Sequence, residues 1–461
     1  MEIHQYKSVY FLGIGGIGMS ALARYFHRCG VMVSGYDKTP TTLTHQLIEE
    51  GIPVHFDDNP ELVPDRPDLV IYTPALPKDN NELQFVIARG FPLKKRSEVL
   101  GMITRNAKTI AIAGTHGKTT ITTLVAHLLI TAGIDSIAFL GGISKNYNSN
   151  FITSGLSAHQ LAGSPVYYIV EADEFDRSFL RLYPDIAVIT SADADHLDIY
   201  GNIDEVRLSF GEFTSNLQKN GTMILKKGVD IVPEETDNYI IQTYHLEGDA
   251  DFYPENIRLE NSRFTFDLVT PARTIRNITL GLPGKFNLEN AIAAAAVAYT
   301  VGIPDEVIAQ SLLTFEGVER RFDFQVIHDD FVYIDDYAHH PEELKACICA
   351  VREIYPSKKI TGIFQPHLFT RTRDFADAFA RSLELLDELI LLEIYPAREN
   401  PIAGIDSAML LGKVQLQNKK ICSKTDLTGE LRSSKPEVLL TLGAGDIDQL
   451  VKPIRELFTN M

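Results

Sequence analysis

The residues best suited to chemistry lie in the segment AIAGTHGKTT, residues 111–120. Lys118 could neutralise the β- and γ-phosphates of ATP, the Thr119 hydroxyl could bind Mg²⁺, and successive backbone amides could form an anion nest. The usual loop has its first glycine where Ile112 stands, but a turn at Gly114 can replace it. A plain strand-to-helix turn would explain the glycines but not Lys-Thr-Thr. We therefore predict an ATP site formed by Gly114, Thr115, His116, Gly117, Lys118, Thr119 and Thr120.

A second glycine-rich segment, FLGIGGIGMSALARYF, has the spacing of a dinucleotide-binding turn between a strand and a helix. Its glycines would let backbone amides approach a diphosphate at the start of the helix. An acid at the end of the next strand could accept a ribose hydroxyl. A bare tight turn is the alternative, and the motif does not specify which nucleotide binds. The predicted binding residues are Gly13, Gly15, Gly16, Gly18 and Asp37.

Two acidic clusters follow apolar, strand-like runs in the centre of the chain. VEADEFD places Glu171, Asp173 and Glu174 at one strand end, and ITSADADHLD places Asp193 and His196 at another. Such close acids would repel one another unless they shared a cation. Near a phosphate loop they predict a single metal and phosphate site. For several of these acids, helix caps and solvated turns are the alternative.

Two later strands end in FVYIDDYAHHPEEL and FQPHLFTRTRDF. These endings contain Asp336, His339, Arg371 and Arg373. Two guanidinium groups suit a carboxylate or a phosphate because their planar forks make bidentate hydrogen bonds. A solvated helix face and a polar helix start are the alternatives for the arginines and the histidine.

Apolar β-rich runs alternate with helical periodicity along the chain, which predicts an α/β protein with parallel sheets in three domains. We predict a Rossmann-like substrate-binding domain at 1–106, a central P-loop ATPase-like domain at 107–319 and a Rossmann-like α/β domain at 320–461. Alternation in KNGTMILKKGVD and SRFTFDLVTPARTIRNITL also predicts an antiparallel flank on the central domain.

The composition narrows the possible partners. Of 461 residues, 43 are Lys or Arg and 61 are Asp or Glu, giving a formal net charge of -18. This balance argues against binding to nucleic acid or to an anionic membrane. The four cysteines form no CxxC pair, and neither a signal-peptide pattern nor a membrane-spanning apolar run is found. A reduced, cytoplasmic setting is expected.

Taken together, the motifs resemble the Mur ligase family over nearly the whole chain. The resemblance rests on GIGGIGMSALA, AGTHGKTTITT, EADE, RRFDF, DDYAHHPEE, FQPHLFTRTRDF and EIYPARENPI, and the short GTHGKT loop is itself the family's form. It implies a three-domain enzyme that joins L-alanine to the lactyl carboxylate of UDP-N-acetylmuramate, with ATP and Mg²⁺ required. Movement of the C-terminal domain on ligand binding is also expected, because the ATP loop and the histidine and arginine strand ends lie in different domains.

The resemblance assigns roles to individual residues. Gly13 to Gly18 and Asp37 match positions that bind UDP, and Lys118 and Thr119 match the phosphate and Mg²⁺ positions. Glu171 and His196 match the acid and histidine of the metal site. The nucleotide contacts are implied for Asn287, Asn290, Arg321 and Asp336, and the amino-acid and carboxylate contacts for His339, Arg371 and Arg373.

Three positions depart from the family pattern. Phe286 stands where related ligases often have His, Leu368 where related alanine ligases often have Arg, and Arg207 where some relatives have a carbamylated Lys. Three other interpretations remain open at this point. One is a sister enzyme that attaches a recycled peptide to UDP-N-acetylmuramate, another is a nicotinamide dehydrogenase, and the third is a non-catalytic nucleotide-binding module.

Overall fold

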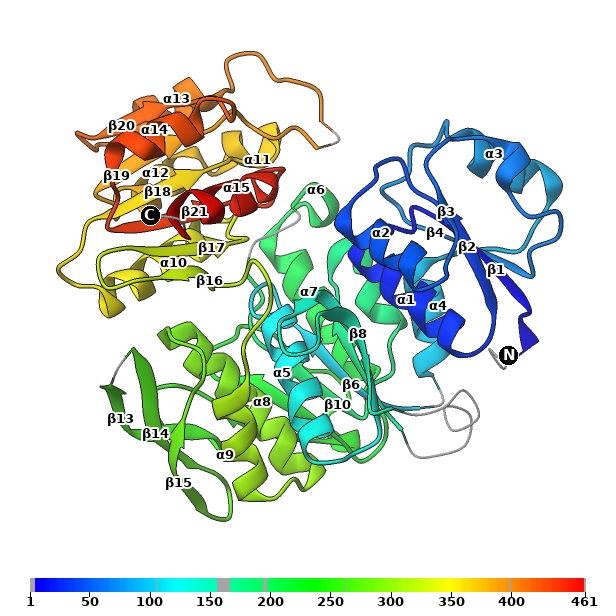
Figure 1. Cartoon of the computed structure of the whole chain (residues 1–461). Helices are drawn as coiled ribbons and strands as arrows, with labels where there is room; N and C mark the ends of the chain where they lie inside the picture. Colours follow the sequence, from blue (N-terminus) through cyan, green and yellow to red (C-terminus); the bar gives the residue numbers. More distant parts are fainter. Residues whose placement is uncertain are drawn as a thin grey trace. The chain divides into compact units, whose positions relative to one another are not determined.

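The computed structural model of the chain describes residues 5–105, 107–155, 166–193, 197–260, 262–397 and 399–459 (Figure 1). The described residues divide into two units. The first contains those within 1–259, 265–281 and 289–316, and the second those within 260–264, 282–288 and 317–461. The predicted α/β class is confirmed, whereas the predicted domain boundaries near 106 and 320 stay predictions.

The N-terminal part of the first unit is a parallel sheet of five strands in the order β3-β2-β1-β4-β5. This is a doubly wound order, in which ligands bind at the carboxyl ends of the strands. β1 ends directly before the first glycine of the predicted diphosphate loop, and α1 follows that loop. The elements are β1 Ser8–Leu12, α1 Ile17–Arg28, β2 Met32–Tyr36, α2 Thr42–Glu49, β3 Val54–His55, β4 Leu69–Tyr72, α3 Asn81–Arg89, β5 Leu93–Lys95 and α4 Arg96–Thr104.

The central sheet of the first unit has seven strands in the order β12-β11-β10-β6-β9-β7-β8. All neighbours are parallel except β7 and β8, which form an antiparallel hairpin. The strands are β6 Lys108–Ala113, β7 Ser136–Ser144, β8 Ser149–Thr153, β9 Tyr167–Ala172, β10 Ile186–Ile189, β11 Gly221–Lys226 and β12 Tyr239–Tyr244. The α-helices that follow these strands directly are α5 Lys118–Thr131, α6 Leu197–Tyr200 and α7 Ile203–Ser215, and later in the chain come α8 Lys285–Val301 and α9 Asp305–Thr314.

The predicted antiparallel flank is only half right. β14 Arg263–Val269 and β15 Thr274–Thr279 are antiparallel and form a separate three-stranded sheet with β13 Tyr253–Glu260. β11, which contains the other predicted segment, is instead parallel to β10 and β12 within the central sheet. Its first four residues are all buried and its last two are half-buried, so the strand does not have the one exposed face that its sequence pattern suggested.

The second unit contains a six-stranded sheet in the order β16-β17-β21-β18-β19-β20. β16 is antiparallel to β17, and the other neighbours are parallel. The strands are β16 Asp323–Ile327, β17 Val332–Asp336, β18 Ile360–Phe364, β19 Glu388–Leu391, β20 Lys419–Ile421 and β21 Val438–Leu442. The helices are α10 Pro341–Ile354, α11 Phe369–Asp374, α12 Ala376–Leu383, α13 Ser407–Lys413, α14 Leu427–Ser434 and α15 Asp448–Thr459.

The hydrophobic core of the first unit is continuous across its two parallel sheets. Phe11 of β1 and Phe26 of α1 belong to the same buried cluster as Ala111 of β6 and Ile137 of β7. Because this apolar surface is shared, the diphosphate loop and the phosphate loop are held on a single packed body. No helix within the described residues is long and apolar enough to cross a membrane.

A buried polar cluster lies in the N-terminal sheet. The Tyr10 hydroxyl is 2.5 Å from Glu82 Oε2 and 2.8 Å from His55 Nε2, and the Asn59 N–H donates to Glu82 Oε1 at 3.1 Å. Burial raises the pKa of Glu82 to about 7, although the hydrogen bonds from Tyr10 and Asn59 act to lower it. The folded protein therefore holds a proton on Glu82 that the unfolded chain releases at lower pH.

This proton makes stability depend on pH. Well below pH 4.5 the carboxyl is protonated in both states, and as the pH rises to 7 the folded state loses roughly 3 kcal/mol relative to the unfolded state. Glu82→Gln should remove that loss. The free energy of unfolding of the variant minus that of the wild type should therefore be larger at pH 8 than at pH 5. Urea titrations at both pH values measure this difference, with exposed Glu61→Gln as the control. An equal difference at the two pH values would contradict the prediction.

Candidate active site

The phosphate loop is shaped by two glycines and by the chain that follows β10. Gly114 has a φ of +128°, and a Cβ placed there would overlap Thr190 Oγ1 and lie 2.8 Å from Ser191 N. Gly117, with a φ of +82°, is the N-cap of α5. The His116 N–H donates to Ser191 Oγ at 3.0 Å, and the Thr190 hydroxyl donates to His116 O at 2.5 Å. The turn therefore begins at Gly114, where only glycine fits.

Lys118 is held within this loop by an ion pair. Its Nζ donates to Gly114 O at 2.7 Å and to the two carboxylate oxygens of Glu174 at 2.7 and 2.9 Å. Burial by itself would lower the pKa of Lys118, but the charges of Glu174, Asp173 and Glu171 raise it above its ordinary value. Lys118 is thus a permanent cation whose present partner, Glu174, stands where a phosphate could pair with it.

Glu171 links the end of β9 to the phosphate loop. Its Oε2 accepts a hydrogen bond from the Thr119 hydroxyl at 3.2 Å, and its Oε1 accepts one from the Gly141 N–H at 2.6 Å. Hydroxyl and carboxylate oxygens are the ligands that Mg²⁺ prefers, so this donor pair fits the predicted metal. His196, the predicted third ligand, lies outside the described residues. Within those residues, no group of three or more His, Cys, Asp or Glu is placed to hold a metal.

The diphosphate loop joins β1 to α1. Gly13, with a φ of +84°, donates its N–H to Tyr36 O at 2.8 Å, and the Gly15 N–H donates to Asp37 Oδ2 at 2.8 Å. α1 begins after Gly16 without a side-chain cap, so the amides of its first turn point towards a ligand position. Asp37 therefore already orders the loop, and its contact with a ribose stays a prediction.

Sequence reasoning missed two basic residues between the diphosphate loop and the acidic end of β9. Lys95 Nζ donates to Asp176 Oδ2 at 2.9 Å, and Arg96 Nη2 donates to Asp173 Oδ2 at 3.4 Å. A Cβ on Gly18 would lie 3.0 Å from Arg96 Nη1, so this guanidinium borders the first turn of α1. The only sequence signal was a short basic run at a strand end, which by itself is common on protein surfaces.

The two asparagines of α8 differ in their surroundings. Asn290 Oδ1 lies 2.6 Å from the position of a Cβ on Gly117, so its amide faces the phosphate loop. Asn287 is buried, and its Nδ2 donates to Pro283 O at 2.8 Å. The contacts of both residues with a nucleotide base stay predictions.

In the second unit, two of the predicted residues, Arg321 and His339, both contact the ring of Tyr337. The Arg321 guanidinium lies 4.9 Å from the centre of the Tyr337 ring, and the centres of the Tyr337 and His339 rings are 5.2 Å apart. His339 in turn packs edge-on against His367 at 6.1 Å. Burial raises the pKa of Asp336 to about 6, although Arg321 and two backbone N–H bonds act to lower it.

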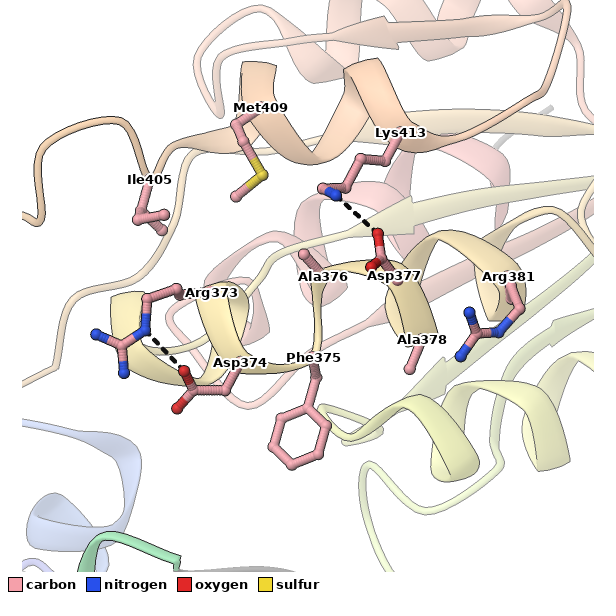
Figure 2. A pocket seen from close by; sticks show the side chains of 10 residues that line it. All are labelled: Arg373, Asp374, Phe375, Ala376, Asp377, Ala378, Arg381, Ile405, Met409 and Lys413. Carbon is pink, nitrogen blue, oxygen red and sulfur yellow. Dashed lines mark hydrogen bonds and ion pairs between the residues drawn. The ribbon is translucent and has the colours of Figure 1, made fainter.

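Arg371 and Arg373 do not share one helix face. Residues two positions apart on an α-helix are rotated by about 200° around its axis, so the two side chains leave α11 in different directions. Figure 2 shows Arg373 paired with its neighbour Asp374, Nε to Oδ1 at 2.7 Å. Arg373 also lines a pocket of about 340 Å³ that Arg381, Lys413, Ile405 and Met409 help to form. Binding of one carboxylate by both arginines stays a prediction.

Two of the three departures from the family pattern have side-chain partners, and the third has an unusual backbone angle. The Phe286 ring packs edge-on against Phe322, with ring centres 5.4 Å apart. Leu368 precedes α11 with a φ of +69°. Arg207 pairs with Asp230 at 2.8 Å on the surface of α7.

Three family models together match most of the chain. The Mur ligase family, catalytic domain model matches residues 8–108, the Mur ligase middle domain model matches 112–298, and the Mur ligase, glutamate ligase domain model matches 320–445. Each matched region contains all or most of one of the three large sheets described above. The chain therefore belongs to the Mur ligase family and has its three-domain architecture.

Full-length relatives and solved structures agree with this placement. The UDP-N-acetylmuramate–L-alanine ligase of Flavobacterium psychrophilum is 50% identical over 460 residues, covering 99% of each chain. That of Parabacteroides distasonis is 49% identical, covering 99% of this chain and 98% of its own. The crystal structure of UDP-N-acetylmuramate-alanine ligase from Thermotoga maritima matches with a TM-score of 0.82 and 28% identity, covering 98% of this chain and 99% of its own.

Proposed function

We propose that this chain joins L-alanine to the lactyl carboxylate of UDP-N-acetylmuramate and converts ATP to ADP and phosphate, in the synthesis of peptidoglycan precursors. The observation that carries the proposal is the phosphate loop, where Lys118 and Thr119 face the carboxylates of Glu174 and Glu171. Full-length relatives named for this reaction support the choice of substrates. The chain is accordingly proposed to act in the cytoplasm, consistent with four cysteines that form no disulfide.

The reaction needs ATP because a carboxylate is a poor electrophile. An oxygen of the lactyl carboxylate attacks the γ-phosphorus, the bond to ADP breaks, and an acyl phosphate forms. The amine of alanine then attacks the acyl carbon, phosphate leaves with the electrons of the C–O bond, and the nitrogen loses a proton. Positioning and charge neutralisation are the main tasks left to the protein.

Lys118 and the diphosphate loop divide these tasks. Lys118 exchanges the carboxylate of Glu174 for phosphate oxygens and neutralises charge that grows on them during transfer. The amides after Gly13 and the first turn of α1 hold the diphosphate of the UDP substrate. Thr119, Glu171 and His196 would hold Mg²⁺, which neutralises phosphate charge when bound.

The C-terminal residues are proposed to recognise the remaining groups. Arg321 and Asp336 serve the nucleotide, while His339, Arg371 and Arg373 serve alanine and the substrate carboxylate. The ring chain of Arg321, Tyr337 and His339 supports a common site at the ends of β17 and β18.

Phosphate release tests the function and the acceptor together. With Mg-ATP and UDP-N-acetylmuramate present, release should be fastest with L-alanine and should fall to background when either substrate is omitted. Glycine, L-serine and the tripeptide L-alanyl-γ-D-glutamyl-meso-diaminopimelate serve as competing acceptors. Turnover with the tripeptide alone would assign the chain to peptide recycling, and release independent of any acceptor would contradict the ligase proposal.

A further inference from the structure

The β7–β8 hairpin contains a bulge whose residues contact both Glu171, beside the phosphate loop, and α1, which follows the diphosphate loop. Its cross-strand pairs include Phe139 with Phe151 and Ser144 with Ser149. Between these pairs, residues 140–143 of β7 stand opposite Asn150 alone on β8. A bulge of this kind bends the strand and redirects backbone groups and side chains, and such bulges are common beside active sites.

On the β7 side, the bulge brings the backbone against the predicted metal acid. The Gly141 N–H donates to Glu171 Oε1 at 2.6 Å. A Cβ on Gly141 would lie 2.5 Å from Glu171 Oε2, so a larger residue would displace the carboxylate. The hairpin therefore determines where Glu171 lies relative to the phosphate loop.

On the β8 side, Asn150 binds the first turns of α1. Its side chain is fully buried, and Nδ2 donates to Ile17 O at 2.5 Å and to Ser20 Oγ at 2.8 Å. Its Oδ1 accepts a hydrogen bond from Arg24, whose guanidinium is held by Glu50 at 2.7 to 3.0 Å. Both N–H donors of the amide and one hydrogen bond to its oxygen are thus directed at one helix, beginning at the end that follows the diphosphate loop.

An aromatic layer supports this contact on the same hairpin. The Tyr25 ring of α1 lies 5.5 Å from Phe139 of β7 and 6.2 Å from Phe151 of β8, measured between ring centres. Rotation of α1 on the hairpin would break both the packing and the buried amide bonds. The hydrogen bonds from Asn150 fix the position of α1 along its own axis, because apolar contacts are not directional.

We propose that Asn150 is a positioning residue for the ligase reaction, holding the diphosphate loop at a set distance from Glu171 and the phosphate loop. The inference rests on the proposed function. A UDP substrate anchored at α1 presents its carboxylate to the γ-phosphate only if α1 and Glu171 keep their spacing. A misplacement of about 1 Å can cost about 100-fold in rate, so the amide acts on catalysis without touching a substrate.

The test compares Asn150→Ala with Ser149→Ala. Ser149 makes two hydrogen bonds to Phe151 within β8 and none to α1, so its loss perturbs the hairpin alone. Asn150→Ala should lower kcat at least about tenfold and raise the KM for UDP-N-acetylmuramate, with the Kd for Mg-ADP within twofold of wild type. Ser149→Ala should keep all three values within twofold.

A second variant separates positioning from folding. Asn150→Asp keeps an acceptor for Arg24 but removes both donations to α1. It should show the same loss of kcat with Mg-ADP binding intact. Wild-type kinetics in either Asn150 variant, or a parallel loss of Mg-ADP binding and activity in both, would overturn the inference. Failure of the proposed function itself would instead show as a wild-type protein without alanine-dependent phosphate release.

Discussion

Lys118→Ala should abolish alanine-dependent phosphate release, lowering kcat by at least about a thousandfold. The variant loses the cation nearest the phosphates, and it also leaves the carboxylate of Glu174 buried without its partner. That carboxylate would then repel the nucleotide. We expect the KM for ATP to rise together with the loss of kcat.

A double variant distinguishes these two effects. In Lys118→Ala/Glu174→Gln the repelling charge is gone, so the KM for ATP should return towards the wild-type value while kcat stays low. Lys227→Ala is the matched control, because Lys227 pairs with Asp249 on the surface of the same unit. A Lys118→Ala enzyme with more than a tenth of wild-type kcat would contradict the assignment of this loop.

Gly114→Ala should weaken Mg-ATP binding by about 100-fold. The backbone at Gly114 has a φ of +128°, where a residue with a Cβ costs roughly 1–3 kcal/mol. The added methyl group would also overlap Thr190 Oγ1. To remove this overlap, either the phosphate loop or the end of β10 must move. The hydrogen bond from Thr190 to His116 O would then be lost.

Gly133→Ala provides the control for backbone strain without overlap. Gly133 follows α5 with a φ of +70°, and no atom lies within 4 Å of a Cβ built there. The Gly133→Ala variant should have a lower melting temperature than the wild type but a Kd for Mg-ATP within about twofold of the wild-type value. Isothermal titration of both variants gives the comparison, and equal affinities would show that the turn at Gly114 does not shape the nucleotide site.

Much of the first unit could be predicted because its motifs are local. The strand before Gly114, the helix beginning at Lys118 and the glycine spacing from Gly13 to Gly18 each depend on neighbours a few residues away. The strand β11 was assigned to the wrong arrangement for the opposite reason. Its pairing with β10 and β12 is set by partners far along the chain, which its own alternation does not report.

The candidate site was predicted in part. Glu171 was expected near the phosphate loop, but its hydrogen bond from Gly141 depends on a bulge whose register no local pattern specifies. Glu174 was grouped with the metal acids, yet in the structure it pairs with Lys118. The prediction that Arg371 and Arg373 act together on one carboxylate stays a prediction, because both lie on the short helix α11 two positions apart.

The sequence alone was enough to predict which residues could bind phosphate, the α/β class and the family that the chain resembles, because these depend on residue type and short spacing. Tertiary structure alone decided that Asn150 would reach α1, that Gly141 would hold Glu171 and that Arg96 would border Gly18. Each of these contacts joins segments 30 or more residues apart. Such contacts arise only when the sheets pack into one core, since their geometry is a property of the packed elements and of no single segment.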